Sequence, residues 1–433
     1  MLVDIWDQNM SRSSMERWLQ VCEADNSQQY PININLLAKL FGASWYFTRF
    51  VFFRGAKILP IFDQTPKLYF TITALHEQFL KKLKDAKHVT LFDTLIIIKN
   101  EYMLQIFLAQ LIGTHSQQEI EKALTILAEV SLLCAVEILI EDNIQLKENI
   151  AILAMGRMAG YEMNFGSDID IIFLYASDKQ VSDMNKISAF TRRIISTISM
   201  PKPEGSLYQV DTRLRPYGNS GTLLTSSQAF VDYHKGERDI WERQMMKRCR
   251  VVYDHGGIAN HVLRQIKPFI YQQFGKKTLC QEITSVRQLV IDTQIDTKKA
   301  QYNLKVGEGG IMDIDFLIDY LQLQHGHEQP ELHTESTRSA LQASAKHQYF
   351  SQQSAKELLQ VYDYLKRIEG NLRVFDMKTI DTLSQDTDVT TRVARSMGYL
   401  QADRKQAGQE FLVDYQKQVH NVRQIYHATL NGI

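Results

Sequence analysis

The sequence predicts an α+β fold that is mostly helical, with one small mixed sheet between an N-terminal helical region and a C-terminal helical bundle. Apolar residues recur at helical spacing early and late in the chain, whereas strand-like runs are confined to the stretch in between. A chain of 433 residues also exceeds what one hydrophobic core usually organises. We therefore expect a helical region over residues 1–112, a sheet-containing domain over 113–264 and a helical bundle over 265–433.

The N-terminal region shows aromatic and aliphatic side chains at helical spacing over residues 36–62. Ser116 and Glu119 then have capping-box spacing ahead of a long apolar run, which predicts a helix that begins directly after the serine. The most apolar stretch, 126–140, contains two glutamates and is shorter than the ~20 residues that span a bilayer. It is expected to be a core helix.

Three strands are expected next, over residues 149–156, 168–176 and 208–215, the last with clean alternation of apolar and polar side chains. Residues 183–200 suit a crossover helix between the second and third strands. These segments predict a mixed sheet with helices packed on it.

Two further helices are expected before the bundle. Thr225 and Gln228 have capping-box spacing, and a basic helix is expected over residues 241–251. Its basic side chains are interpreted as a solvated face. These are Arg243, Lys247 and Arg250.

Two long helices dominate the C-terminal region. The first is expected to begin at a capping box formed by Ser354 and Glu357. Its apolar stripe consists of Leu358, Val361, Leu365, Ile368, Leu372 and Phe375. The stripe of the last helix consists of Phe411, Tyr415, Val419, Val422 and Tyr426. Such stripes are typical of a helical bundle.

Charge and cysteine content restrict the function classes. The 49 Lys and Arg residues balance 49 Asp and Glu residues, which argues against nucleic acid or an anionic membrane as a partner. Four scattered cysteines without a CxxC pair suggest neither a zinc site nor a disulfide framework. The N-terminus lacks the features of a secretion signal, so we expect a cytoplasmic protein.

The segment GSDIDIIFLY, residues 166–175, places two aspartates on a strand. Asp168 and Asp170 share one face of that strand, because alternate side chains point the same way. Asp211 occupies the third expected strand, so three carboxylates meet if these strands are neighbours. Two such charges ~4 Å apart repel by roughly 4 kcal/mol at an effective dielectric of 20, and a divalent cation would compensate them.

Oxygen ligands favour Mg²⁺ or Mn²⁺, and carboxylates with substrate phosphates are a usual way of holding Mg²⁺. The three aspartates are therefore our candidate metal ligands and catalytic residues. A solvated strand edge is the alternative for a lone DxD motif. The small residues before the pair and the third aspartate favour the metal.

Several residues near the aspartates are candidates for binding phosphate. Gly166 and Ser167 would let a phosphate approach the backbone. Arg213 and Arg215 could hold phosphate or merely neutralise the acids. Lys305 precedes a Gly-Gly turn, which suits phosphate binding or a plain helix entry. The following helix contains Asp313 and Asp315, which lie about 200° apart on a helix and are not expected to act as a pair.

Four segments in order resemble one known family. They read GRMAGYEMNFGSDIDIIFLY, YQVDTRLRPYGNSG, DIWERQMMKRCRVV and NLKVGEGGIMDIDFL, and together they extend over residues 149–325. They resemble the successive motifs of glutamine synthetase adenylyltransferase/adenylyl-removing enzyme. The resemblance implies a nucleotidyltransferase-type, polymerase-beta-like sheet in which Asp168, Asp170 and Asp211 bind the metal.

Full-length members of that family carry two related halves, one that attaches AMP to a tyrosine of glutamine synthetase and one that removes it by phosphorolysis. This chain is long enough for one half. The segments around the aspartates and LKRIEGNLR resemble the removing half, whereas EGGIMDIDFLIDYLQLQHGHEQPEL is closer to the adenylylating half. The resemblance therefore implies removal of AMP, with adenylylation as the alternative.

The resemblance also implies partners: glutamine synthetase, nucleotide (ATP or ADP), phosphate and a PII-type nitrogen-signalling protein. A second class of function is a regulator that keeps the fold and binds these proteins without turnover. The sequence departs from the family at GRMAG, where the family has Gly-Lys-Leu-Gly-Gly. Arg157 keeps the positive charge, but Ala159 lacks the freedom of glycine, which bears on nucleotide affinity.

Overall fold

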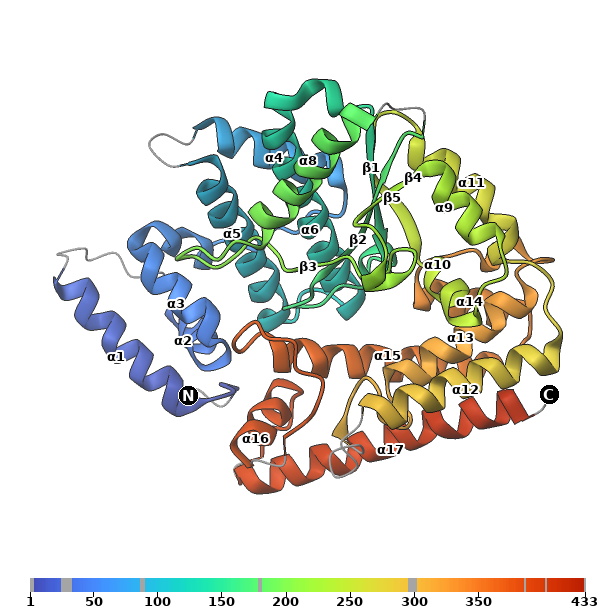
Figure 1. Cartoon of the computed structure of the whole chain (residues 1–433). Helices are drawn as coiled ribbons and strands as arrows, with labels where there is room; N and C mark the ends of the chain where they lie inside the picture. The colour runs from blue at the N-terminus through green and yellow to red at the C-terminus, as the bar shows by residue number, and fades with distance from the viewer. Residues whose placement is uncertain are drawn as a thin grey trace.

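The computed structural model describes residues 4–24, 33–85, 90–177, 181–294, 302–384, 387–401 and 403–431. It is a mostly helical α+β protein with one five-stranded mixed sheet, as predicted (Figure 1). The strands are β1 (Ile150–Met155), β2 (Ile169–Tyr175), β3 (Val210–Asp211), β4 (Leu224–Ser226) and β5 (Cys249–Asp254).

The sheet has the order β3-β2-β1-β5, with β4 also paired to β2. β1 is antiparallel to both β2 and β5, whereas β3 and β4 run parallel to β2. β3 and β4 therefore occupy successive stretches of the same β2 edge. This leaves the beginning of β2 beside β3, which is where the two aspartate-bearing segments meet.

Helices cover both faces of the sheet. Those near the sheet are α7 (Gly156–Ala159), α8 (Val181–Ser199), α9 (Ser227–Lys235), α10 (Ile240–Met246) and α11 (Ile258–Ile270). On one face Ile169, Ile171 and Phe173 join a core shared with α8 and the N-terminal helices. On the other, Ile172 and Leu174 join a core shared with α9, α11 and the C-terminal helices. Asp168 and Asp170 thus lie on the same face of this segment as Ile172 and Leu174, and farther along β2 that face is apolar and covered by helices.

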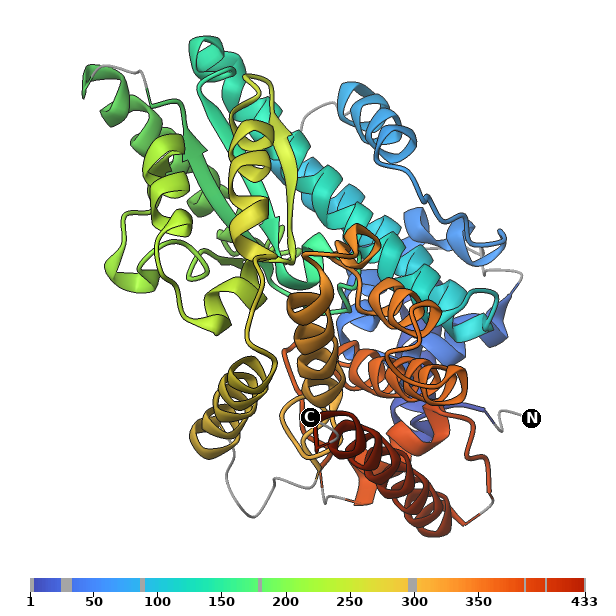
Figure 2. The ribbon, with the colours of Figure 1, turned by 90° about the vertical axis from the view of Figure 1, so that its right-hand side faces the viewer.

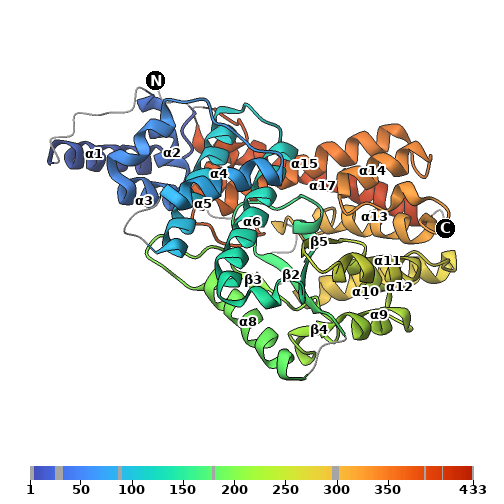
Figure 3. The same ribbon diagram turned by 90° about the horizontal axis from the view of Figure 1, so that it is seen from above.

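The N-terminal helices extend from one end of the molecule to the sheet (Figure 3). They are α1 (Gln8–Ala24), α2 (Ile34–Ala43), α3 (Trp45–Arg54), α4 (Ile72–Asp85), α5 (Leu91–Ile112) and α6 (Gln117–Ile140). Short 3₁₀ helices follow α3 and α6, at Gly55–Phe62 and Glu141–Leu146. The predicted capping box at Ser116 and Glu119 is present at the start of α6.

Helices α5 and α6 are long and apolar enough to cross a membrane by length and composition, but 72% and 83% of their most apolar windows are buried inside the protein. The prediction that residues 126–140 form a core helix is therefore confirmed. In space, α6 packs between α4, α5 and α8 and reaches the sheet at β5.

The C-terminal helices pack against one another below the sheet (Figure 2). They are α12 (Lys276–Gln294), α13 (Ile311–His325), α14 (Thr337–Lys346), α15 (Gln352–Arg373), α16 (Thr387–Ser396) and α17 (Arg404–Asn431). Single 3₁₀ turns lie at Gly218–Ser220 and Pro330–Leu332. The predicted stripes on α15 and α17 are buried, apart from partial exposure of Phe375 and Val419. The three-part domain division remains a prediction.

One strand prediction and one helix prediction are wrong in extent. The third strand was expected over 208–215, but β3 ends at Asp211 because this carboxylate accepts a hydrogen bond from the backbone N–H of Arg213 and turns the chain. The expected helix over 241–251 instead ends at Met246, and Cys249 begins strand β5, which pairs with β1.

The interpretation of the basic residues as a solvated face is also wrong. Arg243 and Lys247 are 5% and 4% exposed. Lys247 pairs with Asp319 of α13, and Arg250 on β5 pairs with Glu129 of α6. Arg250 therefore links the sheet to α6, and Lys247 links the end of α10 to α13.

Two helix starts differ from the predicted capping boxes. The N-cap of α9 is Ser226 instead of Thr225, and that of α15 is Ser351 instead of Ser354. In each helix the observed serine accepts a hydrogen bond from the backbone N–H three residues later. Each helix start has more than one hydroxyl residue within three positions, which made the sequence signal ambiguous.

Candidate active site

The pairing of β2 and β3 places the candidate carboxylates on neighbouring backbone segments. Asp170 is the register partner of Asp211, and Asp168 lies one residue before β2. The end of β1 approaches from the other side, where a Cβ on Gly156 would lie 3.1 Å from the Asp170 carboxylate. Gly156 also has a φ of +54°. The close approach to Asp170 and the positive φ therefore both favour glycine at this position.

The electrostatics at these three side chains differ. Burial, and then the negative charge of Asp211, raise the pKa of Asp170 to about 7. The same two causes raise the pKa of Asp168. Hydrogen bonds from Arg213 instead hold the pKa of Asp211 below its usual value. Two of the three carboxylates therefore lack sufficient positive charge around them.

This shortage fits a divalent cation. The donors are carboxylate oxygens on neighbouring backbone segments, which is the ligand chemistry that Mg²⁺ and Mn²⁺ prefer. The nearby cations Lys305, Arg213 and Arg373 already lower the pKa of Asp168, yet it stays raised. Additional positive charge at this point would be stabilising.

The two predicted arginines have different surroundings. Arg213 is exposed, and its guanidinium donates to both oxygens of Asp211, with Nε 2.9 Å and Nη2 2.5 Å from Oδ2. Arg215 instead donates to the carbonyls of Thr212 and Gly221 and closes the loop between them. Of the two arginines, Arg213 is the one that contacts a candidate carboxylate while its side chain stays exposed to solvent.

The loop before β2 presents the small residues. Gly166 has a φ of +62°, and its carbonyl accepts a hydrogen bond from Thr379 at 3.2 Å. The hydroxyl of Ser167 accepts one from the backbone N–H of Asn164 at 3.0 Å. Lys305, in the loop before α13, is exposed and lowers the pKa of Asp168 and Asp170. All three predicted residues therefore lie around the aspartates.

Arg373, at the end of α15, is a site residue that the sequence did not single out. It is buried, pairs with Glu369 and Asp381, and lies 3.5 Å from the Ser167 hydroxyl. Its charge also lowers the pKa of Asp168. The available signal was its place in LKRIEGNLR, which begins 195 residues after Asp170.

Arg157 does not face the aspartates as a free charge. Its guanidinium donates to Asp315 at 2.5 Å, to Tyr362 at 2.6 Å and to Glu162 at 3.2 Å. Ala159 lies in the helical turn α7, where a side chain causes no backbone strain. The departures at GRMAG are therefore accommodated by the fold.

Asp313 and Asp315 have separate partners, as predicted. Asp313 is fully buried and accepts hydrogen bonds from Arg287 at 2.6 Å and from the backbone of Gly309 at 2.7 Å. Asp315 accepts hydrogen bonds from Arg157 and Arg248, neither of which belongs to α13. Both aspartates are therefore engaged in ion pairs away from the three candidate metal ligands.

Comparison with known proteins adds the decisive observation. A family model for glutamate-ammonia ligase adenylyltransferase matches residues 34–265, which is more than half of the chain. This chain belongs to the glutamate-ammonia ligase adenylyltransferase family. The match covers β1 to β5 and the three aspartates, and it confirms the resemblance inferred from the sequence motifs.

Two further similarities extend beyond that match. A model for GlnD PII-uridylyltransferase matches residues 285–430, which include α13 to α17. The chain is also 27% identical over 379 residues to a bifunctional glutamine synthetase adenylyltransferase/adenylyl-removing enzyme of Psychromonas ingrahamii. That alignment covers 84% of this chain and 39% of the relative, so this family member spans well under half of the relative's length.

Proposed function

We propose that this chain carries out metal-dependent nucleotidyl transfer on the regulatory tyrosine of glutamine synthetase, in the cytoplasm. The preferred direction is removal of AMP by phosphorolysis, with ATP-dependent adenylylation as the alternative. The observation that carries the proposal is the pairing of Asp170 with Asp211 directly beside Asp168. Family membership and the name of the relative support the substrate.

Asp168, Asp170 and Asp211 would hold Mg²⁺ or Mn²⁺. When bound there, the metal supplies positive charge that polarises the phosphate under attack and stabilises the departing oxygen. Arg213, Lys305 and the Ser167 hydroxyl offer donors to phosphate oxygens from the surrounding loops, and Gly166 leaves room for the phosphate to approach. Arg373 would hold the Ser167 hydroxyl by a hydrogen bond and act on Asp168 through its positive charge.

In the removing direction, an oxygen of inorganic phosphate forms a bond to the phosphorus of AMP-tyrosine. The bond from phosphorus to the tyrosine oxygen breaks, that oxygen takes up a proton, and ADP leaves. In the adding direction, the tyrosine oxygen loses its proton and attacks the α-phosphorus of ATP, and pyrophosphate leaves. Both displacements develop charge on the same phosphoryl oxygens, so one site can serve either.

A regulator without turnover is the rival function. The match of the C-terminal helices to a PII-uridylyltransferase model favours an additional nitrogen-signalling partner of the PII type. Such a regulator has no need for three carboxylates at neighbouring strand positions, where Asp211 raises the pKa of both Asp168 and Asp170 in the absence of a counterion. Their presence therefore favours the enzyme.

The test supplies the chain with AMP-modified glutamine synthetase and phosphate, or with unmodified glutamine synthetase and ATP, each with Mg²⁺. We expect ADP from the first mixture. Pyrophosphate from the second mixture alone would reverse the direction, and neither product would support the regulator. Asp170→Asn is expected to abolish the activity, whereas Asp85→Asn at the exposed end of α4 should retain it.

A further inference from the structure

A cavity of about 440 Å³ lies directly beside the aspartates. Its walls come from α3 and α5, from the loop before β2, from the loop before β3 and from the segment after α15. Asp168 and Ser167 line one side of it, and Lys99 of α5 lines another. A ligand in this cavity would therefore touch both the carboxylate site and the N-terminal helices.

Lys99 is 3% exposed, and its ammonium group donates one hydrogen bond, to the carbonyl oxygen of Ser206 at 3.2 Å. It also lies 5.4 Å from the centre of the Tyr208 ring. Within the described residues no carboxylate forms an ion pair with it. An ammonium has three donors, so the pairing of Lys99 is incomplete.

The other cations of the cavity differ in this respect. Arg49 and Lys378 both pair with Asp376, at 3.1 and 2.5 Å, and both are largely exposed. Lys99 is thus the buried cation of the cavity that lacks a counter-charge from the protein. Burial of an unpaired charge is costly, so such groups are ordinarily paired or meet a charged ligand. Burial also lowers the pKa of Lys99 to about 7, which an anion would reverse.

We propose that Lys99 and this cavity form a subsite for a phosphate oxyanion that lies next to the three aspartates. The proposal rests on the proposed function, because that reaction supplies two sources of this chemistry. One is inorganic phosphate, the attacking group in AMP removal. The other is the terminal phosphates of ATP, which leave in adenylylation. The occupant of the Lys99 subsite therefore follows the direction of the reaction.

The experiment measures binding of inorganic phosphate, ATP and AMP to the full chain by calorimetry with Mg²⁺ present, for wild type and Lys99→Met. Methionine keeps the length of the apolar stem and removes the ammonium. We expect affinity for the true occupant to fall roughly tenfold or more, as for loss of a charge-assisted hydrogen bond. A loss for phosphate alone identifies free phosphate, and a loss for ATP without AMP identifies the terminal phosphates.

Unchanged affinity of Lys99→Met for all three ligands would overturn the proposal. An equal loss of affinity for phosphate, ATP and AMP would also overturn it. So would a failure of the wild-type protein to bind phosphate and ATP. Thermal unfolding provides the check on folding. Lys99→Met removes an unpaired buried charge, so its melting temperature is expected to match or exceed that of wild type. Lys99→Arg keeps the charge and is expected to retain measurable affinity.

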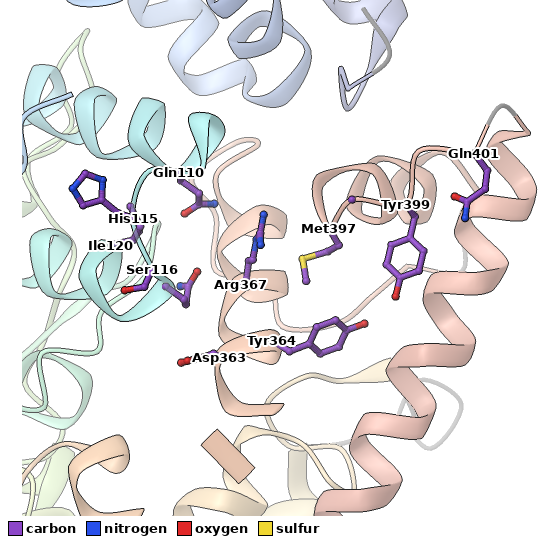
Figure 4. A pocket seen from close by; sticks show the side chains of 13 residues that line it. Gln110, His115, Ser116, Ile120, Asp363, Tyr364, Arg367, Met397, Tyr399 and Gln401 are labelled. Atoms are coloured by element: carbon purple, nitrogen blue, oxygen red, sulfur yellow. The ribbon is translucent and has the colours of Figure 1, made fainter. Parts of the chain in front are cut away.

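Arg367 offers a matched control. It lines a different cavity of about 550 Å³, between the α5–α6 turn and the C-terminal helices, where Figure 4 shows it between Gln110 and Met397. In the described part of the chain it has no ion-pair partner. Arg367→Met removes the same charge and is expected to leave all three affinities unchanged. Loss of phosphate binding in Arg367→Met instead of Lys99→Met would overturn the assignment to Lys99.

Failure of this inference and failure of the proposed function give different results. If Asp170→Asn abolishes AMP transfer while Lys99→Met binds every ligand normally, the function stands and the subsite is wrong. If Lys99→Met weakens phosphate binding but wild type transfers no AMP in either direction, the subsite stands and the enzyme is wrong.

Discussion

At the scale of single residues, Asp170 is the most informative group. Its folded-state pKa of about 7 lies above the ordinary value of 3.8, mainly because of burial and then because of Asp211. The folded protein therefore holds a proton here between about pH 4 and 7 that the unfolded chain has released. The stability from this group is present below pH 4 and is lost as pH rises through 7.

We therefore expect the metal-free protein to lose stability between pH 5 and 8 by more than Asp170→Asn does. Saturating Mg²⁺ should restore stability at pH 8, because it neutralises the ionised carboxylate. Urea unfolding at both pH values, with and without Mg²⁺, measures this. Equal pH dependence in both proteins would show that Asp170 is not desolvated as described.

Arg213 and Arg215 are close in sequence but are expected to have different roles. Arg213→Ala removes an exposed side chain, so stability should change by less than about 0.5 kcal/mol while AMP transfer falls roughly 10- to 100-fold. Arg215→Ala removes the donors that close the 212–221 loop, so faster proteolytic cleavage within that loop is expected. Limited proteolysis beside the transfer assay distinguishes them, and reversed phenotypes would contradict the assignment.

The sequence could predict the aspartates because a period of two, a preceding Gly-Ser and a third acid are all local signals. It could not predict that Arg243 and Lys247 are buried. Lys247 contacts Asp319 and Gln322 of α13, and Arg243 donates to the carbonyl of Phe269 in α11, so both contacts depend on how helices farther along the chain pack. Arg373 was missed for the same reason, since only tertiary packing brings it to Ser167.

At the scale of elements, helices were easier to predict than strands. The stripe on α15 repeats over many residues, whereas β3 and β4 contain two and three residues and carry almost no periodic signal. Residues 249–254 follow a helix without a turn residue between them, so the pattern favoured one continuous helix. Pairing with β1 decides the outcome in favour of β5.

The start of α6 supports a quantitative prediction. Ser116 accepts from the backbone N–H of Glu119, and the Glu119 carboxylate accepts from the backbone N–H of Ser116 at 2.8 Å. Ser116→Ala should lower the free energy of unfolding by about 1 kcal/mol, because a helix N–H loses its acceptor. Ser13→Ala, at an exposed position within α1, is the control and should cost less. Chemical denaturation measures both, and equal effects would contradict a role for the cap.

At the scale of the whole molecule, two apolar cores lie on opposite faces of the sheet, and buried ion pairs join the elements around them. Arg338 of α14 pairs with Glu121 of α6 at 2.6 Å, and Arg157 pairs with Asp315 of α13. These contacts connect the sheet and the N-terminal helices to the C-terminal bundle. Arg338 also pairs with Asp363 of α15, the helix that carries Arg373 to the candidate active site.

Glu162 is central to these ion pairs. It is 1% exposed and accepts hydrogen bonds from Arg157, Tyr362 and Thr337. Burial acts to raise its pKa, but the charges of Arg248, Arg157 and Arg338 outweigh burial and hold the pKa below its usual value. Its charge therefore balances three guanidinium groups that themselves come from different elements.

Glu162→Gln keeps the size of this side chain and removes its charge, which leaves buried arginines short of a counterion. We expect a loss of about 3 kcal/mol in unfolding free energy, together with faster hydrogen exchange in α14 and α15. Glu331→Gln removes a carboxylate that pairs with Lys346 and His347 at the surface, where solvent screens the charges, so it should cost far less stability than Glu162→Gln. If the two variants unfold alike, the buried ion pairs do not hold the C-terminal helices to the sheet. If Glu162→Gln instead loosens α15, AMP transfer should fall with it, because Arg373 would no longer be held beside Ser167.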